Sequence, residues 1–342
     1  TRPQFEEQES IEVRLESVFD RFRTTVGAFI WDSEYSLWQN TYFFGGLFAS
    51  PWTKQETENT AFFGQLDFDV TDRLTLTLGG RYTKDEKDFC QVFTGAPAAG
   101  QQATTNDYEG HPRVPLFAHG ADNICPQWAQ GVISNNYVDN VTGEAKTFTG
   151  KQSWSEFTPK VGLTYSLENG ILYASYTEGF RSGGFNGRAS APNNSGPFEP
   201  ESVESLEFGF KTSWLDSTLQ FNGAVFMTDY DNKQEDVVLP DPVAVTLTIV
   251  QNAAGATMDG AEFELVWMPT PGLTLNAALG YLDASYDEYR VLDLAGNMVD
   301  KTGFDLRRAP ELNYSVGANW EVQVGESAFL VANVNYRWLD DY

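Results

Sequence analysis

The sequence has no hydrophobic run of about 18 residues, so no transmembrane helix is expected. Basic residues are scarce as well: 22 Lys and Arg stand against 48 Asp and Glu, which gives a net charge of -26. So acidic a chain is a poor partner for nucleic acid, because that binding needs a basic surface. No signal peptide is recognised in the charged opening, TRPQFEEQES, and we therefore expect a mature or truncated chain.

Residues that carry catalysis or bind metals are also few. The two histidines, His111 and His119, lie in a polar segment with Asp107, Glu109 and Asp122 nearby. A metal site is conceivable there, but solvated loop residues explain the pattern better. Neither histidine belongs to a Ser-His-Asp motif, and no G-x-x-x-x-G-K phosphate loop occurs. The sequence therefore predicts no enzyme activity, no cofactor and no metal site.

There are only two cysteines, Cys90 and Cys125, and both fall in one long polar stretch at about 88–152. Two cysteines in one predicted loop suggest a disulfide and an oxidising compartment. The alternative, two unrelated free thiols, remains open at this stage.

What the chain does have is a repeated alternation of apolar and polar residues, as in LTLTLGGRY at 74–82. A period of two is typical of β-strands with one apolar and one polar face. The pattern predicts about twelve strands of about 10 residues, and no helix-period segment competes with them. The expected strands are 8–16, 24–32, 58–69, 74–84, 154–166, 171–181, 202–213, 218–229, 256–268, 273–281, 312–320 and 330–338.

Short and long connections alternate between these strands. The Asn169-Gly170 step is a strong hairpin signal, whereas the segment at about 88–152 is far longer than loops of compact domains. In an outer-membrane barrel, the short turns are periplasmic and the long loops extracellular.

The composition of the two faces favours a membrane barrel over a soluble sandwich or propeller. Thr, Ser, Asn, Gln and Gly dominate the polar face, as expected for a wet interior. Aromatic residues recur at the ends of the apolar stripes, where they suit bilayer interfaces. They are Tyr82, Trp214, Trp267, Tyr281, Trp320, Tyr336 and Trp338. The predicted fold class is therefore all-β, an antiparallel transmembrane β-barrel, since only closed barrels satisfy strand backbones in hydrocarbon.

Several motifs resemble one known family. The stretch 171–186, ILYASYTEGFRSGGFN, is a strand that ends in a glycine-rich turn. Further motifs follow in order: EPE at 199–201, EFGFK at 207–211, Asn222, Ala224, Phe226, DY at 229–230, Gln234, NAA at 252–254, Gly260, Glu262 and Glu264. Together they resemble the TonB-dependent outer-membrane receptors, most strongly over 154–281.

The resemblance implies a barrel of about 22 strands with a plug in its lumen. No plug domain or TonB-contacting motif is recognised, so we expect residues 1–342 to be a partial barrel. The resemblance also implies the outer membrane of a Gram-negative bacterium as location. The implied partners are outer-membrane lipid and lipopolysaccharide, the protein's own plug, the TonB-ExbB-ExbD energy complex acting through that plug, and a small ligand such as a ferric siderophore.

Two groups of residues are candidate sites. Ligand contacts at loop tips are predicted for Trp128, Tyr137, Arg181, Phe185, Asn186 and Arg188. Charged residues predicted to face the lumen and plug are Arg81, Lys160, Glu207, Lys211, Glu262, Glu264 and Arg337. A charge on that face must be hydrated or paired. Its partner is either the plug or a neighbouring strand, as in a Lys211–Glu262 pair.

The predicted function is that of barrel wall and extracellular ligand-binding loops in active uptake of a scarce nutrient, by default a ferric siderophore. The alternatives are a passive porin or structural barrel, and uptake of oligosaccharide or cobalamin by the same fold.

Overall fold

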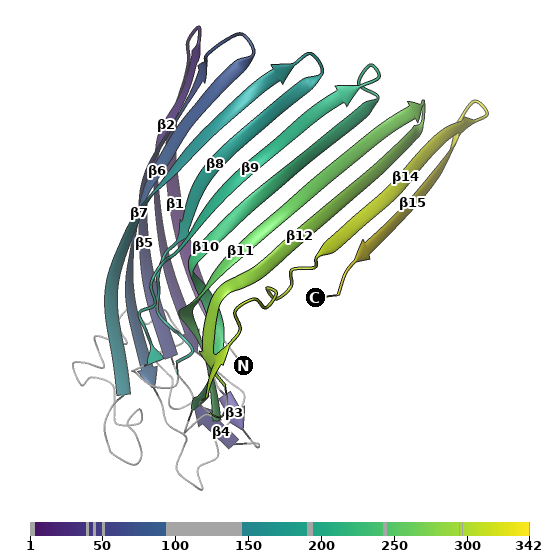
Figure 1. Ribbon diagram of the computed structural model, residues 1–342. Helices are drawn as coiled ribbons and strands as arrows, with labels where there is room; N and C mark the ends of the chain where they lie inside the picture. The colour runs from purple at the N-terminus through teal and green to yellow at the C-terminus, as the bar shows by residue number, and fades with distance from the viewer. Residues whose placement is uncertain are drawn as a thin grey trace.

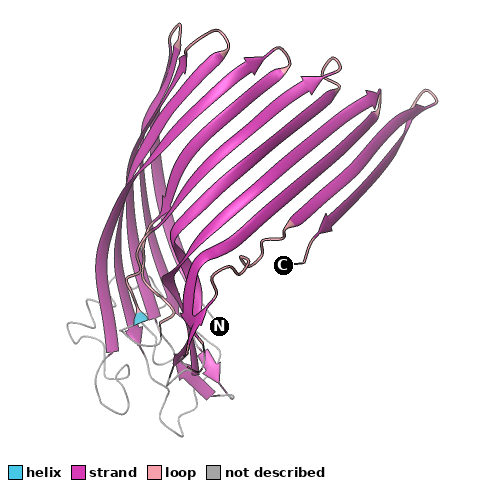
Figure 2. Cartoon of the chain, in the orientation of Figure 1, coloured by secondary structure: helices cyan, strands magenta, loops and turns pink. Residues whose placement is uncertain are grey.

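The computed structural model describes residues 4–38, 41–43, 46–49, 52–93, 146–189, 194–241, 245–293, 295 and 297–341. These residues form an all-β structure dominated by one 13-stranded sheet (Figures 1 and 2). Within them, no helix has the length and apolar character needed to cross a membrane.

The main sheet follows the chain almost without interruption. Its strands are β1 (Gln4–Val18), β2 (Phe22–Trp38), β5 (Trp52–Asp69), β6 (Leu74–Phe93), β7 (Lys146–Leu167), β8 (Gly170–Arg181), β9 (Glu201–Trp214), β10 (Leu219–Asp241), β11 (Val245–Thr270), β12 (Leu273–Leu292), β14 (Leu312–Val324) and β15 (Ala328–Leu339). Each pairs antiparallel with the next of this series, so the sheet is a continuous meander. Short β13 (Met298–Asp300) adds to β12, and β3 (Thr41–Phe43) with β4 (Gly46–Ala49) forms a separate pair.

The sheet is strongly curved, and its two edge strands, β1 and β15, do not pair with each other in the described structure (Figure 1). Tight turns join the strands at one end, and all the long connections lie at the opposite end, where β10 and β11 alone in the meander are separated by only three residues. We call these the short-turn end and the long-loop end. In the turn after β9, Leu215, Asp216 and Ser217 all have positive φ angles, of 53°, 55° and 66°.

The twelve predicted strands are all present, but their predicted length of about 10 residues is wrong. The strands of the meander contain 12 to 26 residues. The ends of the predicted 88–152 loop are also strands, because Asp88 pairs with Lys151 and the ladder continues to the pair Phe93–Lys146. The pattern missed these extensions because the charged run KDEKD at 84–88 interrupts the apolar alternation.

In the part of the chain that the structure describes, no second layer covers the apolar face of the sheet. Ile11 and Val13 are each 67% exposed, and Val334 is 68% exposed. Exposed apolar side chains recur from β1 to β15, whereas a sandwich would bury them against another sheet. The sandwich alternative is therefore wrong. The exposed apolar side chains form a surface that is suited to contact with the hydrocarbon of a membrane.

Buried side chains are concentrated near the long-loop end. One cluster contains Tyr286, Tyr289 and Leu306 with alanines of β11 and β12. A second contains Phe89, Trp154 and Phe185. The sheet is thus a thin wall near the short-turn end and a packed structure near the long-loop end.

Candidate functional site

The segment between β8 and β9 folds back against the sheet, and we name its described residues, 182–189 and 194–200, the interior strap. Thr53 Oγ1 and Gln91 Nε2 each donate a hydrogen bond to Gly187 O at 3.0 Å. Ser195 Oγ donates to Gln91 Oε1, also at 3.0 Å. Gln91 and Ser195 are completely buried. The strap is therefore fixed to β5 and β6, which are distant in sequence.

An aromatic cluster anchors the same strap to β6 and β7. Phe185 stacks on Phe89 with ring centroids 4.9 Å apart, and Trp154 lies at 6.4 Å from Phe185. Trp154 Nε1 also donates to Glu199 Oε2 at 3.1 Å. Gly183 is needed for this close packing, since a Cβ there would lie 2.3 Å from Phe198 O and 2.6 Å from the Trp154 ring.

Two amide side chains tie the strap to β10 and β11. Gln234 Nε2 donates to Ser182 O at 3.1 Å and to Glu199 O at 3.0 Å. Asn252 Nδ2 donates to Glu199 O at 2.8 Å, and Asn252 Oδ1 accepts from Glu199 N at 2.7 Å. Backbone groups that a sheet would pair are thus satisfied by side chains. Gln234, Asn252 and Glu199 all belong to the motifs noted in the sequence.

Lys87 lies between the strap and β7. No carboxylate of the described residues lies within ion-pair distance of its ammonium group. Its Nζ donates to Gly183 O at 2.5 Å and lies 5.6 Å from the centre of the Trp154 ring. Burial lowers the pKa of Lys87, although Asp85 acts in the opposite direction. The strap is therefore bound by a lysine whose charge is stabilised by a carbonyl and an aromatic face.

A buried charge cluster lies on the other side of the strap, at the long-loop end. Glu235 accepts hydrogen bonds from Lys233 Nζ at 2.5 Å, Tyr286 Oη at 2.9 Å and Arg307 Nη2 at 3.0 Å. Burial raises the pKa of Glu235, but these hydrogen bonds outweigh it and the pKa lies below its ordinary value. The Arg307 side chain remains 68% exposed, whereas Tyr286 and Tyr289 are buried, so the cluster presents a cation to its surroundings.

The residues predicted to lie at loop tips occupy different environments in the structure. Phe185 and Asn186 are only 9% and 7% exposed and hold the strap, so their expected position at an exposed tip is wrong. Arg181 and Arg188 are exposed and lie within ion-pair distance of Glu201 and Asp236, at 3.6 Å and 3.4 Å. Trp128, Tyr137, His111, His119 and Cys125 lie outside the described residues. Cys90 is buried in β6 and disulfide-bonded, and its pairing with Cys125 remains a prediction.

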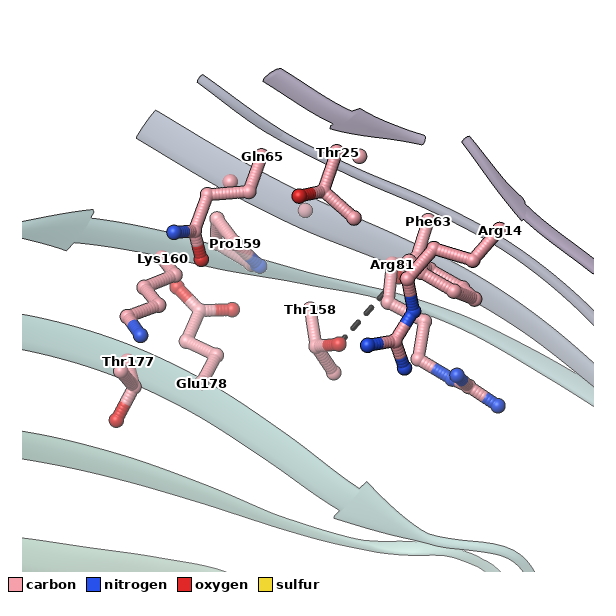
Figure 3. Close-up of a pocket in the computed structure, with 13 residues that line it drawn as sticks. Arg14, Thr25, Phe63, Gln65, Arg81, Thr158, Pro159, Lys160, Thr177 and Glu178 are labelled. Carbon is pink, nitrogen blue, oxygen red and sulfur yellow. Dashed lines mark hydrogen bonds between the residues drawn. The ribbon is translucent and has the colours of Figure 1, made fainter. Parts of the chain in front are cut away.

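Two of the predicted polar-face charges share a cavity. Arg81 and Lys160 line a space of about 440 Å³, together with Arg14 and Phe63 (Figure 3). The space lies over the polar face of the sheet, and its lining residues come from the strands from β1 to β8. The guanidinium groups of Arg81 and Arg14 lie 5.7 Å and 6.0 Å from the centre of the Phe63 ring. We call this space the cationic pocket.

The predicted acidic residues lie on other strands of the same face. Glu207 is hydrogen-bonded by the Tyr173 hydroxyl, and Glu262 contributes to the same electrostatic environment. Glu264 shares a cross-strand row with Asn222 and Lys211. Among the described residues, no ion pair joins Lys211 to Glu262 or Glu264. Arg337 lies apart from these groups on the edge strand β15.

Sequence reasoning missed Arg14, Phe63 and the Glu235 cluster. The alternation places Arg14 on the polar face of the first strand. Its alignment with Arg81 depends on the pairing of the strands between them, in which Gly27 and Phe63 occupy the same cross-strand row. Arg307 lies in a segment without strand periodicity, so no pattern could place it against Glu235.

Comparison with known proteins gives a consistent picture. A family model described as "TonB dependent receptor-like, beta-barrel" matches residues 7–342. The probable TonB-dependent siderophore receptor PiuA of Acinetobacter baumannii is 23% identical over 234 residues, which is 63% of this chain and 30% of that protein. The ferric-pyoverdine 358 receptor of Pseudomonas putida is 30% identical over 125 residues, or 36% of this chain and 14% of the receptor. The chain thus spans less than a third of the length of either relative.

Solved structures share the fold at low sequence identity. The ferric yersiniabactin uptake receptor FyuA of Yersinia pestis has a TM-score of 0.73 and 15% identity, covering 99% of this chain and 43% of the receptor. The ferric-catecholate import receptor Fiu of E. coli K12 has a TM-score of 0.58 and 16% identity, covering 94% and 43%. Both matches support the same strand arrangement.

Proposed function

The chain belongs to the TonB-dependent receptor β-barrel family, and from this we propose that it is barrel wall of an outer-membrane transporter that takes up ferric siderophores. The observation that carries the proposal is the two-faced sheet. Its apolar face is exposed and, among the described residues, has no covering layer, while its polar face contains a cationic pocket, carboxylates and a packed strap. Such a wall separates hydrocarbon from a hydrated interior. Transport, with no catalytic step, is the activity we assign.

The ligand class rests on the two relatives, both of which are called siderophore receptors by name. The long-loop end supplies suitable chemistry in the exposed guanidinium groups of Arg307 and Arg188, because ferric siderophores are polar and often anionic. Trp128 and Tyr137 of the long loop are proposed as further ligand contacts, and a Cys90–Cys125 disulfide as a constraint on that loop.

The remaining partners follow from the same proposal. A plug domain occupies the polar face, and Glu207, Lys211, Glu262 and Glu264 take part in its docking. Through the plug, the TonB-ExbB-ExbD complex supplies energy, while outer-membrane lipid and lipopolysaccharide contact the apolar face. The location is the outer membrane of a Gram-negative bacterium, with the short turns on the periplasmic side.

The test is uptake of radiolabelled iron by a Gram-negative host that lacks its own siderophore receptors and expresses the full-length protein. We expect accumulation with one or a few ferric siderophores, and loss of it when TonB is deleted. Uptake that continues without TonB would indicate a passive pore. TonB-dependent uptake of an oligosaccharide or cobalamin instead of iron would retain the mechanism and replace the ligand.

A further inference from the structure

The cationic pocket is unusual in this acidic chain because its positive charges exceed its negative ones. Arg14, Arg81 and Lys160 line it, and Glu178 is the one carboxylate among its lining residues. In a protein with a net charge of -26, a local excess of cations needs an explanation. Figure 3 shows Arg14, Arg81 and Phe63 on one side of the space, with Lys160 and Glu178 on the other.

Two of the three cations have no ion-pair partner within the described structure. Arg81 Nε donates to Thr83 Oγ1 at 3.0 Å, and its guanidinium lies over Phe29 and Phe63. Lys160 has no ion pair there, and the Glu178 carboxylate accepts from Tyr176 Oη at 2.7 Å. Arg14 is paired with Glu12 of its own strand at 2.6 Å. A charged donor with no anion is short of its strongest interaction, which an added carboxylate would supply.

The floor of the pocket also has room for an additional group. A Cβ at Gly79 would lie 3.4 Å from Gly64 O, 3.6 Å from Lys160 Cβ and 3.8 Å from Gln65 Cβ, which are ordinary contacts. The chain's own packing therefore does not require glycine at this position. The ring of Phe63 packs against Gly27, where a Cβ would come within 2.3 Å of it, so one wall of the space is a closely packed aromatic ring.

The position of the pocket indicates what enters it. Gln65 and Thr25 lie near the short-turn ends of β5 and β2. The strap lies at the other end of these strands, near the long loops. A ligand that arrives through the long loops meets the strap and the Glu235 cluster first. The pocket is therefore accessible to a group that lies along the polar face near the short turns.

We propose that the cationic pocket is the docking point for a carboxylate-bearing segment of the folded domain that occupies the polar face. This inference rests on the proposed function, which places a plug there, and it adds the chemistry of the contact. An Asp or Glu side chain of that segment accepts hydrogen bonds from Arg81 and Lys160, while its backbone approaches Gly79.

The first experiment identifies the occupant by cross-linking in the full-length protein in outer membranes. A photo-reactive phenylalanine analogue replaces Gln65 in the pocket, and a matched control replaces Asn333 on the same face of β15. We expect the first to cross-link to a peptide of the same polypeptide that contains Asp or Glu, and the control to miss that peptide. Cross-links only to neighbouring strands or lipid, or to a segment without carboxylates, would overturn the proposal.

The second experiment measures how tightly that peptide is held. Hydrogen exchange is measured without cross-linking, on the peptide that the first experiment identifies. Its exchange should be about tenfold faster or more in Arg81→Glu and Lys160→Glu, because a charge-assisted hydrogen bond contributes about 1.5–3 kcal/mol. Gly79→Leu should have a similar effect by filling the space without changing a charge. Lys84→Glu, on the opposite face and paired with Glu86, is the control. Equal exchange in all four variants would contradict the assignment.

The two proposals fail separately. Normal siderophore uptake with the wrong cross-linked peptide removes the pocket assignment and leaves the transporter. A correct cross-link in a protein that takes up no siderophore removes the ligand proposal and leaves the docking point.

Discussion

The side chain of Asn186 and the backbone of Val250 exchange two hydrogen bonds. Asn186 Nδ2 donates to Val250 O at 3.2 Å, and Val250 N donates to Asn186 Oδ1 at 2.8 Å. One amide side chain of the strap thus copies the pairing of a neighbouring β-strand on β11. The strap is attached to the sheet by the same type of bond that holds the sheet together.

Replacing Asn186 by Ala should release the strap from β11. The change leaves the N–H and C=O of Val250 without these partners, which costs about 1–3 kcal/mol locally. We expect faster hydrogen exchange at Val250 and along the strap, with the exchange of β14 and β15 unchanged. Asn297→Ala, in an exposed turn, is the control. Unchanged exchange at Val250 in Asn186→Ala would show that the side chain is not the attachment.

Gly183→Ala should displace the strap from the aromatic cluster. The added methyl group would overlap Phe198 O and the Trp154 ring, so one of them must move. We expect a change in Trp154 fluorescence and easier proteolysis within the strap. Gly64→Ala should change neither, since its Cβ would meet only ordinary contacts at 3.6 Å and beyond. Identical digestion of the two variants would argue against close packing at Gly183.

The Glu235 cluster should weaken in acid. Because the folded-state pKa of Glu235 is lowered, its stabilising contribution is complete above the ordinary value of 4.5 and is lost as pH falls through the lowered pKa. Exchange of the segment that contains Arg307 should therefore increase, relative to its intrinsic rate, between pH 7 and the acid range. In Glu235→Gln this dependence should disappear. A pH dependence of equal size in the variant would assign it to another group.

Leu215→Asn should stabilise the turn between β9 and β10. Leu215 has a φ of 53°, and a leucine tolerates that left-handed conformation less well than asparagine does. The expected gain in the free energy of unfolding is about 0.5–1 kcal/mol, read from the denaturant midpoint of the refolded protein. Val70→Asn, in another short turn, is the matched control and should give no gain. A lower midpoint for Leu215→Asn would show that its side chain contributes more than its backbone costs.

The alternation of side chains was sufficient to predict the meander, because each strand near the short-turn end has one apolar face. Beyond that band charged residues such as KDEKD at 84–88 interrupt the alternation, and the pairs Asp88–Lys151 and Phe93–Lys146 could not be read from periodicity. The interior strap was mistaken for a loop tip for a related reason. Its Gly, Asn and Arg content is typical of exposed loops, and its burial depends on Gln91 and Gln234 in distant strands.

The cationic pocket was predicted only in part. Alternation places Arg81 and Lys160 on the polar face, but their common cavity is set by the register that pairs Gly79 with Lys160. Register depends on hydrogen bonding along the whole ladder, and no single motif encodes it.

The meander also has a consequence for the order of folding. Strands of the main path that are joined by a tight turn need only each other to form a hairpin, and loops that close over few residues do so at low entropic cost. The strap is different, because the bond from Thr53 to Gly187 joins residues 134 positions apart. The wall should therefore assemble hairpin by hairpin, and the strap should close last, as a late and separately measurable kinetic step.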